Sequence, residues 1–304
     1  MKIQIALAAV LAVTGCKKHE DAKPDDKAER AKEMADVEAK AAKEKARWTP
    51  ELTQQAVALR DQTAPDAKTA LAAIAGGPHR EPGNSARDAW RHPIETLTFL
   101  GIEPTQTVVE LGGGGWYTEF LAPLLADHGK LIVVAGDPSE PHGHAADLFL
   151  AKSPELYGKV QRLAFSKTNL SFGPPASADT VLAMREMHNW ERSHRLAEYL
   201  KAVHDVLKPN GVFGVEEHRA AEGKPGEATA ETGYLPEAWT IEKVTAAGFK
   251  LEDKSEINAN PKDTKDHPQG VWNLPPTFAD GDKDKAKYQA IGESDRMTLK
   301  FRRI

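Results

Sequence analysis

The chain has 304 residues, of which 40% are hydrophobic and 28% charged, and its formal net charge is −5. This length suffices for one large α/β domain with attachments, and the apolar content suffices for a sizeable buried core. The lack of a basic excess argues against a nucleic-acid partner, and no apolar run reaches the length of a transmembrane helix.

The first residues have the features of an exported protein. Lys2 precedes an apolar run, from Ile3 to Val13, that is too short to span a membrane as a mature helix. Small residues then lead to Cys16, the only cysteine of the chain, so an internal disulfide and a cysteine-rich zinc site are both excluded. The pattern resembles the lipobox of bacterial lipoproteins, in which the cysteine becomes the lipidated first residue.

That resemblance implies a signal peptide over residues 1–15 and a periplasmic lipoprotein held at a membrane through Cys16. Because Lys17 rather than an aspartate follows the cysteine, it also implies sorting to the outer membrane. A cytosolic N-terminus that happens to be apolar is the alternative.

The next two segments read as helical attachments. Residues 16–47 begin with the cysteine and continue with Lys, Glu, Asp and Ala almost throughout, and they have no apolar stripe. They predict a solvated helix or a disordered tether that spaces the domain from the lipid. Residues 48–83 predict a helical extension, which Gly76-Gly77-Pro78 ends.

Strands and helices alternate from residue 84 to residue 304, which predicts one α/β domain. Apolar and β-branched runs predict strands over 107–111, 131–135, 160–165, 180–184, 212–215, 250–257 and 296–302. Helical patterns fall over 116–128, 192–207 and 236–247, and another helix starts at Pro93. We expect a Rossmann-like, seven-stranded, mostly parallel sheet covered on both faces, with the last strand inserted antiparallel.

The strongest chemical signal is the segment 108–115, in which a buried strand ends in four glycines ahead of a helix. Such a turn lets a ligand approach the backbone closely, but it serves NAD, FAD and S-adenosylmethionine alike. The glycine spacing does not give the dinucleotide fingerprint G-x-G-x-x-G. Instead, Glu110 precedes the first glycine, Gly112, by two residues.

This segment resembles the first motif of S-adenosylmethionine-dependent methyltransferases, Asp/Glu-x-Gly-x-Gly-x-Gly, in which the acid lies beside the amino-acid end of the cofactor. The resemblance implies cofactor contacts by Glu110, Gly112, Gly113, Gly114, Trp116, Asp137 and Asn169. Trp116 replaces the third glycine, and we expect it to narrow the methionine end of the pocket or to change how the cofactor sits. Asp137 would accept the ribose hydroxyls or only start a turn, and Asn169 would contact the adenine or only shape a loop.

Further segments resemble a family of bacterial predicted methyltransferases that are often exported. They are residues 87–93, 113–119, 188–190, 258–268 and 292–297. The resemblance covers residues 84 to 301. It implies a class I methyltransferase fold with S-adenosylmethionine as cofactor, and it does not name a substrate.

Three polar residues follow the fourth and fifth predicted strands, where a methyl acceptor would meet the cofactor. They are His188, Glu217 and His218. His188 could take a proton from the acceptor near neutral pH, or it could simply pack the loop against the next helix. Arg91 and His92 could close the site from the other side, or only cap the helix that starts at Pro93.

The sequence gives no firm metal site, and none is expected. Two groups of candidates have simpler explanations. Surface polar groups explain the first, which is Asp263, Asp266 and His267 with Glu293 or Asp295. A flexible surface turn explains the second, which is His142 and His144 with Asp147. The first group belongs to a long loop, 258–295, which is of a length typical of functional lids or disordered segments.

The leading hypothesis is methyl transfer from S-adenosylmethionine to a small-molecule acceptor. The cofactor is made in the cytosol, so an exported lipoprotein would rarely meet it. The alternative is therefore a non-catalytic periplasmic ligand-binding lipoprotein on the same fold. The sequence carries no signal for the acceptor or for the oligomeric state.

Overall fold

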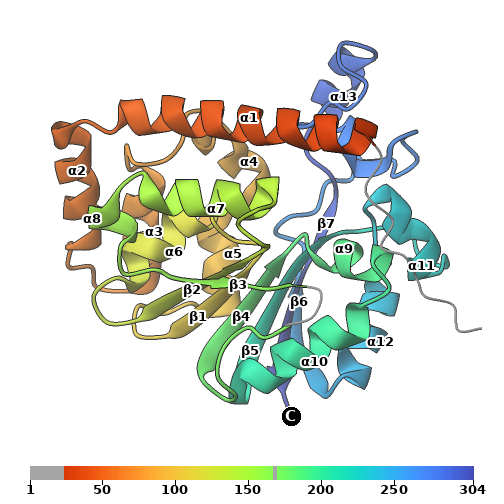
Figure 1. Cartoon of the computed structure of the whole chain (residues 1–304). Coiled ribbons are helices and arrows are strands. Elements are labelled where there is room, and N and C mark those ends of the chain that lie inside the picture. Colours follow the sequence, from red (N-terminus) through yellow and green to blue (C-terminus); the bar gives the residue numbers. More distant parts are fainter. Residues whose placement is uncertain (1–23, 167–169) are drawn as a thin grey trace, which may run out of the picture.

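Seven strands form one sheet in the computed structural model, which describes residues 24–166 and 170–304 (Figure 1). The strand order is β3-β2-β1-β4-β5-β7-β6. The strands are β1 (Thr107–Leu111), β2 (Lys130–Ala135), β3 (Gln161–Ala164), β4 (Ala178–Met184), β5 (Leu207–His218), β6 (Phe249–Ser255) and β7 (Arg296–Arg303). β7 lies between β5 and β6 and is antiparallel to both, whereas the other pairs are parallel. The expected class I methyltransferase fold, with its inserted last strand, is confirmed.

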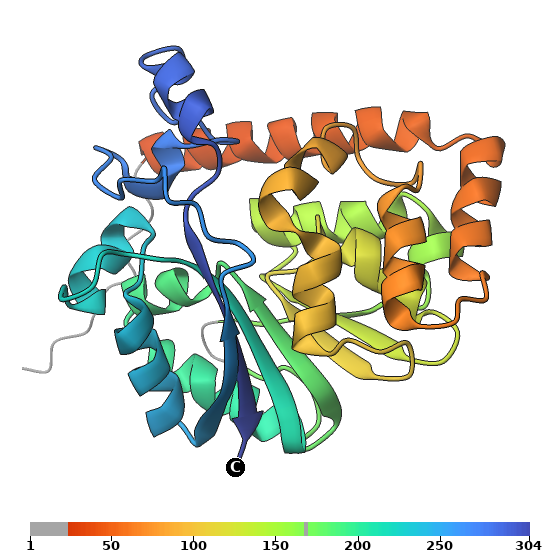
Figure 2. The ribbon, with the colours of Figure 1, turned by 180° about the vertical axis from the view of Figure 1, so that it is seen from behind.

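Helices cover both faces of this sheet (Figures 1 and 2). They are α1 (Pro24–Arg47), α2 (Pro50–Arg60), α3 (Ala67–Ala75), α4 (Asp88–Arg91), α5 (Pro93–Leu100), α6 (Thr118–Leu125), α7 (Pro141–Ala151), α8 (Pro154–Tyr157), α9 (Met187–Arg192), α10 (Leu196–Val206), α11 (Gly226–Thr229), α12 (Glu237–Ala246) and α13 (Lys285–Ile291), with 3-10 turns η1 (Ser85–Arg87), η2 (Ala230–Thr232) and η3 (Gly270–Asn273). None of the helices in the described part of the chain is both long and apolar enough to cross a membrane.

The strands carry apolar residues on both sides because each face of the sheet is buried. On β1, Val108 packs into a core shared with α3, α5 and α6, whereas the next residue, Val109, packs into a core shared with α10 and α12. Successive side chains of a strand point to opposite faces, so a strand between two helical layers reads as a continuous apolar run.

Two predicted boundaries were wrong in ways that matter for the site. The fifth strand was expected to end at Val215, but β5 continues to His218, so Glu216 and Glu217 belong to the strand and are buried. A single helix was expected over 192–207, but α9 ends at Arg192 and α10 starts at Leu196. Pairing with β4 and β7 extends β5 beyond its apolar run.

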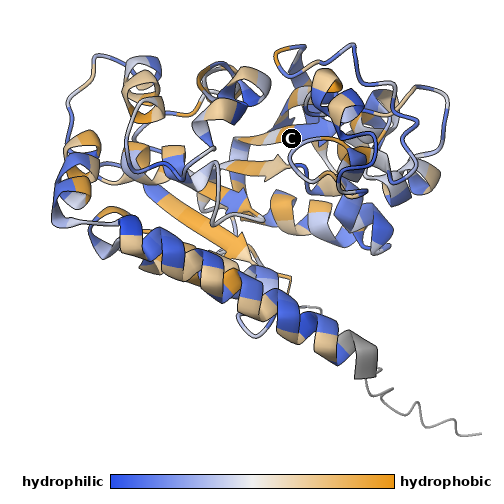
Figure 3. Ribbon diagram, turned by 90° about the horizontal axis from the view of Figure 1, so that it is seen from above, coloured by the Kyte–Doolittle hydropathy of each residue, from blue (hydrophilic) through white to orange (hydrophobic). Residues whose placement is uncertain are grey.

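The charged segment before the domain forms the long helix α1, one of the two forms expected for it. Its residues are mostly exposed, and in the view from above it is hydrophilic along most of its length (Figure 3). It does not extend away from the domain as a spacer: α1 lies along α7 over one edge of the sheet (Figure 1). Its last turn is held by Arg47, which donates to the carbonyls of Pro78, His79 and Arg80 at 2.7–3.1 Å.

The helices that follow α1 join the main core. Ala56 of α2 and Leu71 and Ile74 of α3 are buried in the same cluster as the strand residues on that face. The helical extension expected over 48–83 is therefore packed directly on the sheet layer.

The inserted strand β7 should be essential for stability. Phe301 is fully buried and its ring lies 6.2 Å from that of Phe213 on β5. We expect Phe301→Ala to lower the free energy of unfolding by about 3–5 kcal/mol, because it removes a large buried side chain and leaves a cavity.

The control is Ile304→Ala, three residues later, where the side chain is 75% exposed and the change should stay within about 0.5 kcal/mol. Urea denaturation of both variants measures the difference. Equal losses would show that β7 does not contribute to the core as described.

Candidate active site

The glycine-rich turn joins the end of β1 to α6. Gly112 and Gly114 have φ values of +66° and +90°, a conformation that side chains rarely tolerate. A Cβ on Gly114 would lie 2.6 Å from the Cβ of Ala146, so the turn packs directly against α7. The hydroxyl oxygen of Thr118 accepts hydrogen bonds from the amides of Gly114 and Gly115 at 2.9 and 3.1 Å. The turn is thus shaped before any ligand binds.

Glu110 is a buried carboxylate beneath this turn. It is 4% exposed, and the Thr118 hydroxyl donates to its Oε2 atom at 2.7 Å. A Cβ on Gly113 would lie 2.8 Å from the carboxyl carbon of Glu110, which explains why position 113 is a glycine. Burial raises the pKa of Glu110 to about 7, against the opposing effect of Thr118. Glu110 forms no ion pair with the described residues.

A second carboxylate, Glu186, lies over the same turn and was missed in the sequence. A Cβ on Gly112 would lie 2.2 Å from its Oε1 atom. Its side chain makes no hydrogen bond or ion pair with any described residue, and burial raises its pKa to about 7. The preceding residue, Arg185, has a φ of +62° and turns the chain at the end of β4. Because β4 pairs with β1, an acid directly after β4 could have been placed at this turn.

Trp116, at the position of the third motif glycine, packs on the helical side of the turn. Its ring nitrogen donates to the carbonyl of Asn84 at 3.2 Å, and its ring lies 5.3 Å from the ring of Phe120. The guanidinium groups of Arg80 and Arg91 lie 5.3 and 5.2 Å from the indole centroid. The indole is therefore held from several sides, and its effect on a cofactor stays a prediction.

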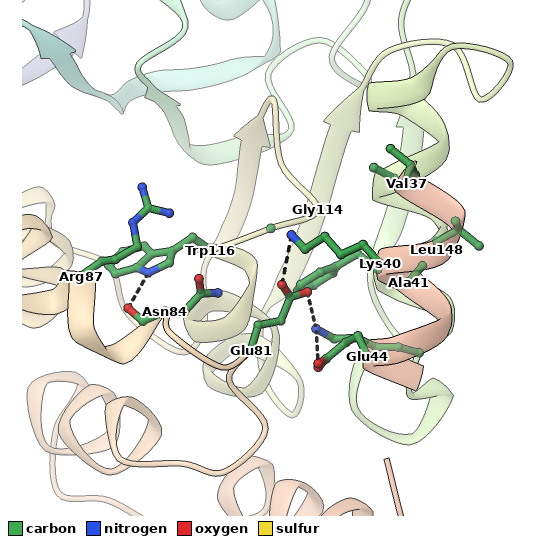
Figure 4. Close-up of a pocket in the computed structure, with 14 residues that line it drawn as sticks. Val37, Lys40, Ala41, Glu44, Glu81, Asn84, Arg87, Gly114, Trp116 and Leu148 are labelled. Carbon is green, nitrogen blue, oxygen red and sulfur yellow. Dashed lines mark hydrogen bonds and ion pairs between the residues drawn. The ribbon is translucent and has the colours of Figure 1, made fainter. Parts of the chain in front are cut away.

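A pocket of about 280 Å³ opens between the turn, α7 and α1 (Figure 4). Its floor includes Gly114 and Trp116, and charged side chains line the α1 side. Lys152 lies 3.2 Å from Glu81 and 3.6 Å from Glu44, and Lys40 of α1 lies 3.5 Å from Glu81. This volume is at the lower end of the range for small-molecule sites, so it would hold part of a ligand.

Asp137 lies at the start of the loop after β2, as expected, and is exposed. Its Oδ1 atom accepts hydrogen bonds from the amide and the hydroxyl of Ser139, both at 2.8 Å, and these bonds lower its pKa. The turn-forming role is therefore present. Its Oδ2 atom has no partner among the described residues, so a ribose contact stays a prediction. Asn169 lies outside the described residues, as does Cys16.

His188, Glu217 and His218 do come together, at the carboxyl ends of β4 and β5. Glu217 is fully buried; its Oε1 atom lies 2.9 Å from Nδ1 of His188, and its Oε2 atom accepts from the amide of His188 at 3.1 Å. The two imidazole rings are 5.4 Å apart. Nδ1 of His218 lies 2.5 Å from the hydroxyl of Ser294. Burial lowers the pKa of His218 well below its usual value, with the charge of His188 adding to the effect.

Behind this cluster lies a buried network of ion pairs. Arg296, at the start of β7, lies 2.9 Å from Glu216 and 2.7 Å from Glu293. Glu293 also pairs with Arg91 at 2.9 Å and with Arg87 at 2.7 Å. Burial acts to raise the pKa of Glu293, but the three arginines lower it to about 2. Arg91 is thus an internal partner of the long loop rather than a solvated cap.

The long loop is ordered, with η3 and α13 inside it, and its acids are engaged by the protein. Asp263 lies 2.9 Å from Nε2 of His267 and accepts from the hydroxyl of Tyr234 at 3.1 Å. Asp295 pairs with Arg219 and Lys265 at 2.9 and 2.7 Å. The interpretation of these residues as surface groups holds for Asp266, which is exposed, and was wrong for the other four, which are buried: Asp263, His267, Glu293 and Asp295.

The other group of metal candidates was placed in a flexible surface turn, which was also wrong. His142, His144 and Asp147 lie on α7. His144 lies 3.6 Å from Glu38 of α1, and Asp147 pairs with Arg162 at 2.8 Å.

Comparison with known proteins adds similarity in fold. No protein-family model matches the chain, and no curated protein matches it in sequence. An S-adenosylmethionine-dependent methyltransferase from Aquifex aeolicus is 15% identical, covers 74% of this chain and 94% of its own, and has a TM-score of 0.47. One from Mesorhizobium loti is 18% identical, covering 73% and 100%, with a TM-score of 0.44.

The cyclase SpnF is 19% identical over 80% of this chain and 97% of its own, with a TM-score of 0.49. Similarities this distant carry no argument about the reaction. The assignment to the class I methyltransferase fold rests on the sheet order and on the antiparallel β7.

The raised pKa of Glu186 leads to a pH-dependent prediction. Its value of about 7 in the folded chain lies above the 4.5 of an unperturbed glutamate. Between these values the folded state binds more protons, so stability falls as the pH rises from about 4.5 to 7. Glu186→Gln removes this penalty and should raise the free energy of unfolding by about 1–3 kcal/mol at pH 8 and by much less at pH 5.

Urea denaturation at the two pH values measures this difference. Glu103→Gln, at an exposed position, is the control and should behave alike at both. A destabilised Glu186→Gln at pH 8 would contradict the description of this carboxylate as half-buried and unpaired.

Proposed function

We propose that this protein transfers a methyl group from S-adenosylmethionine to a small-molecule acceptor, with the cofactor over residues 112–115. The observation that carries the proposal is the pair of carboxylates, Glu110 and Glu186, that flank the glycine turn without a cationic partner among the described residues. Glu110 is buried and Glu186 is half-buried. Acids shielded from water are normally paired, so two unpaired ones beside the glycine backbone indicate a cationic ligand.

The negative charge beside the glycine turn distinguishes between the candidate cofactors. S-adenosylmethionine carries a positive sulfonium and a positive ammonium group, which Glu110 and Glu186 would attract once ionised. A dinucleotide carries a negatively charged pyrophosphate, which the same carboxylates would repel. The nearest arginine, Arg185, is paired with Glu216 at 3.3 Å and so does not reverse this balance. The exposed Oδ2 of Asp137 could accept the ribose hydroxyls.

The acceptor would enter beside His188. Methyl transfer is an in-line displacement: the acceptor atom bonds to the methyl carbon, the bond from that carbon to sulfur breaks, and the acceptor loses its proton. Glu217 holds Nδ1 of His188, so Nε2, which has no hydrogen-bond partner among the described residues, is the atom that could receive the proton. The ring of Trp272 lies 6.3 Å from that of His188 and would pack beside the acceptor.

Calorimetry with purified protein tests cofactor binding. We expect wild-type protein to bind S-adenosylmethionine more tightly at pH 8 than at pH 6, because Glu110 and Glu186 ionise across this range. Glu186→Gln and Asp137→Ala should each weaken binding about tenfold or more, the effect of losing a charge-assisted contact. Gly112→Val should abolish binding, because the added side chain meets Glu186.

Glu103→Gln is the control and should bind like wild type. Wild-type protein that binds neither S-adenosylmethionine nor S-adenosylhomocysteine, even at millimolar concentration, would overturn the proposal. A non-catalytic ligand-binding lipoprotein would then be the better description.

We also propose that Cys16 carries a lipid and holds the protein at the periplasmic side of a membrane, on the strength of the lipobox-like sequence before it. Cys16→Ser should move the protein from the membrane fraction to the soluble fraction, or leave it uncleaved with Met1 retained. Fractionation and mass spectrometry of the native chain measure both outcomes. An unmodified, full-length native chain would refute the anchor, and it would also remove the objection that an exported protein rarely meets the cofactor.

A further inference from the structure

We propose that His188, Glu217 and His218 form a binding site for a divalent transition-metal ion beside the cofactor crevice. Each residue offers one ligand atom, and the three atoms lie within 4.8 Å of one another. Two neighbouring strands bring them together, because Met184 of β4 is in register with Glu216 of β5. The proposal goes beyond methyl transfer and does not depend on it.

The closest pair already has the spacing of two ligands on one ion. Nδ1 of His188 and Oε1 of Glu217 are 2.9 Å apart. Metal–ligand bonds of about 2.0–2.2 Å place adjacent ligands roughly 3 Å apart, so an ion could take the place of the proton between them. The third donor, on His218, would move inward to complete the set.

Like Glu110 at the glycine turn, and unlike the acids around Arg296, Glu217 has no ion pair with a lysine or arginine side chain among the described residues. Glu216 and Glu293 each lie within 3.0 Å of Arg296, and Asp295 lies 2.7 Å from Lys265. Among the described residues Glu217 has only His188 and two backbone amides as partners. A fully buried carboxylate in this position favours a bound cation.

The surroundings also orient the histidines as ligands. Ser294 holds Nδ1 of His218 at 2.5 Å, which fixes the ring and leaves Nε2 without a partner among the described residues. Metal-binding histidines are usually fixed in this way by a second hydrogen bond. The rings of Tyr234 and Trp272, 6.2 and 6.3 Å from the two imidazoles, shield the cluster from one side.

Two imidazole nitrogens and one carboxylate select the class of ion. Magnesium and calcium prefer oxygen ligands, whereas imidazole suits zinc, iron, cobalt and nickel. Three protein ligands leave at least one coordination position for water or a substrate atom, as in catalytic rather than structural sites. With an ion on Nδ1, Nε2 of His188 would carry the proton of the ring and could not act as the base. If the proposed methyl transfer holds, the ion would take over that role, because an acceptor hydroxyl bound to it would lose its proton more readily.

Metal content tests the site. Full-length protein, purified in detergent through a tag without histidines, is treated with a chelator, reloaded with Zn²⁺ or Co²⁺, and freed of unbound ion. We expect about one ion per chain by mass spectrometry, with visible absorption from Co²⁺. Glu217→Gln and His188→Gln should retain less than a tenth as much, and Ser294→Ala should bind about 10–100-fold more weakly.

His267→Gln is the matched control, because Asp263 and His267 form a buried pair with the same 2.9 Å separation but, among the described residues, no third His, Cys, Asp or Glu donor beside them. It should load like wild type. Circular dichroism checks folding, and Zn²⁺ should raise the thermal midpoint of wild type and His267→Gln only. Should Glu217→Gln fail to fold, His218→Gln replaces it.

Wild-type protein that takes up no ion, or ligand variants that load fully, would overturn the metal site. Cofactor calorimetry on the same samples reports separately on methyl transfer, so the two proposals can fail independently.

Discussion

The segments around the site depend on one buried ion-pair network centred on Arg296. This side chain is 1% exposed; it pairs with Glu216 of β5 and with Glu293 of the long loop, and it donates to the carbonyl of Trp90 ahead of α5. Removing one partner of a buried pair leaves an uncompensated charge, which typically costs about 3–5 kcal/mol. The network therefore fixes four segments relative to one another: the start of β7, the end of β5, the loop 258–295, and the segment of η1 and α4 ahead of α5.

The acids buried in this chain fall into two groups, those with a cationic partner and those without one. Around Arg296 the carboxylates are matched by guanidinium groups, which is what stability requires. At the glycine turn and at Glu217 they are not, although Glu110 and Glu217 are just as buried. Local departures of this kind, in a fold that elsewhere satisfies its polar groups, are typical of functional sites, where stability is sacrificed for binding.

Much of the fold could be predicted because burial on both faces leaves continuous apolar runs. The strand Thr107–Leu111 was placed correctly, and the last strand was expected to be antiparallel, as it is. Glu110 and the glycines could be placed because they are adjacent in sequence. Glu186 was missed because its approach to Gly112 is not visible from neighbouring residues, and it follows only once β4 is placed next to β1.

The long-range contacts had no local signal at all. Nothing in the sequence around Ser294 indicates that its hydroxyl lies beside His218, 76 residues earlier. Similarly, the mixed charges of residues 24–47 were compatible with a helix but gave no sign that it lies along α7. Only three small or apolar residues of its described part, Met34, Val37 and Ala41, are half-buried on its inner side. Ion pairs of Arg30, Lys40 and Glu38 add to the contact.

The attachment of α1 makes the opening of the pocket depend on ionic strength. Besides the half-buried Val37 and Ala41, two ion pairs near the surface hold it along its length. They are Arg30 with Glu140 and Lys40 with Glu81, at 2.9 and 3.5 Å. Dissolved salt weakens such ion pairs: the screening length is about 8–10 Å at physiological ionic strength and becomes shorter as salt is added. The buried contacts of Arg47 at the other end are screened far less. Rising ionic strength would therefore loosen the first turns of α1 while its last turn stays in place. The helix would then rotate about its C-terminal end and uncover the pocket at Gly114.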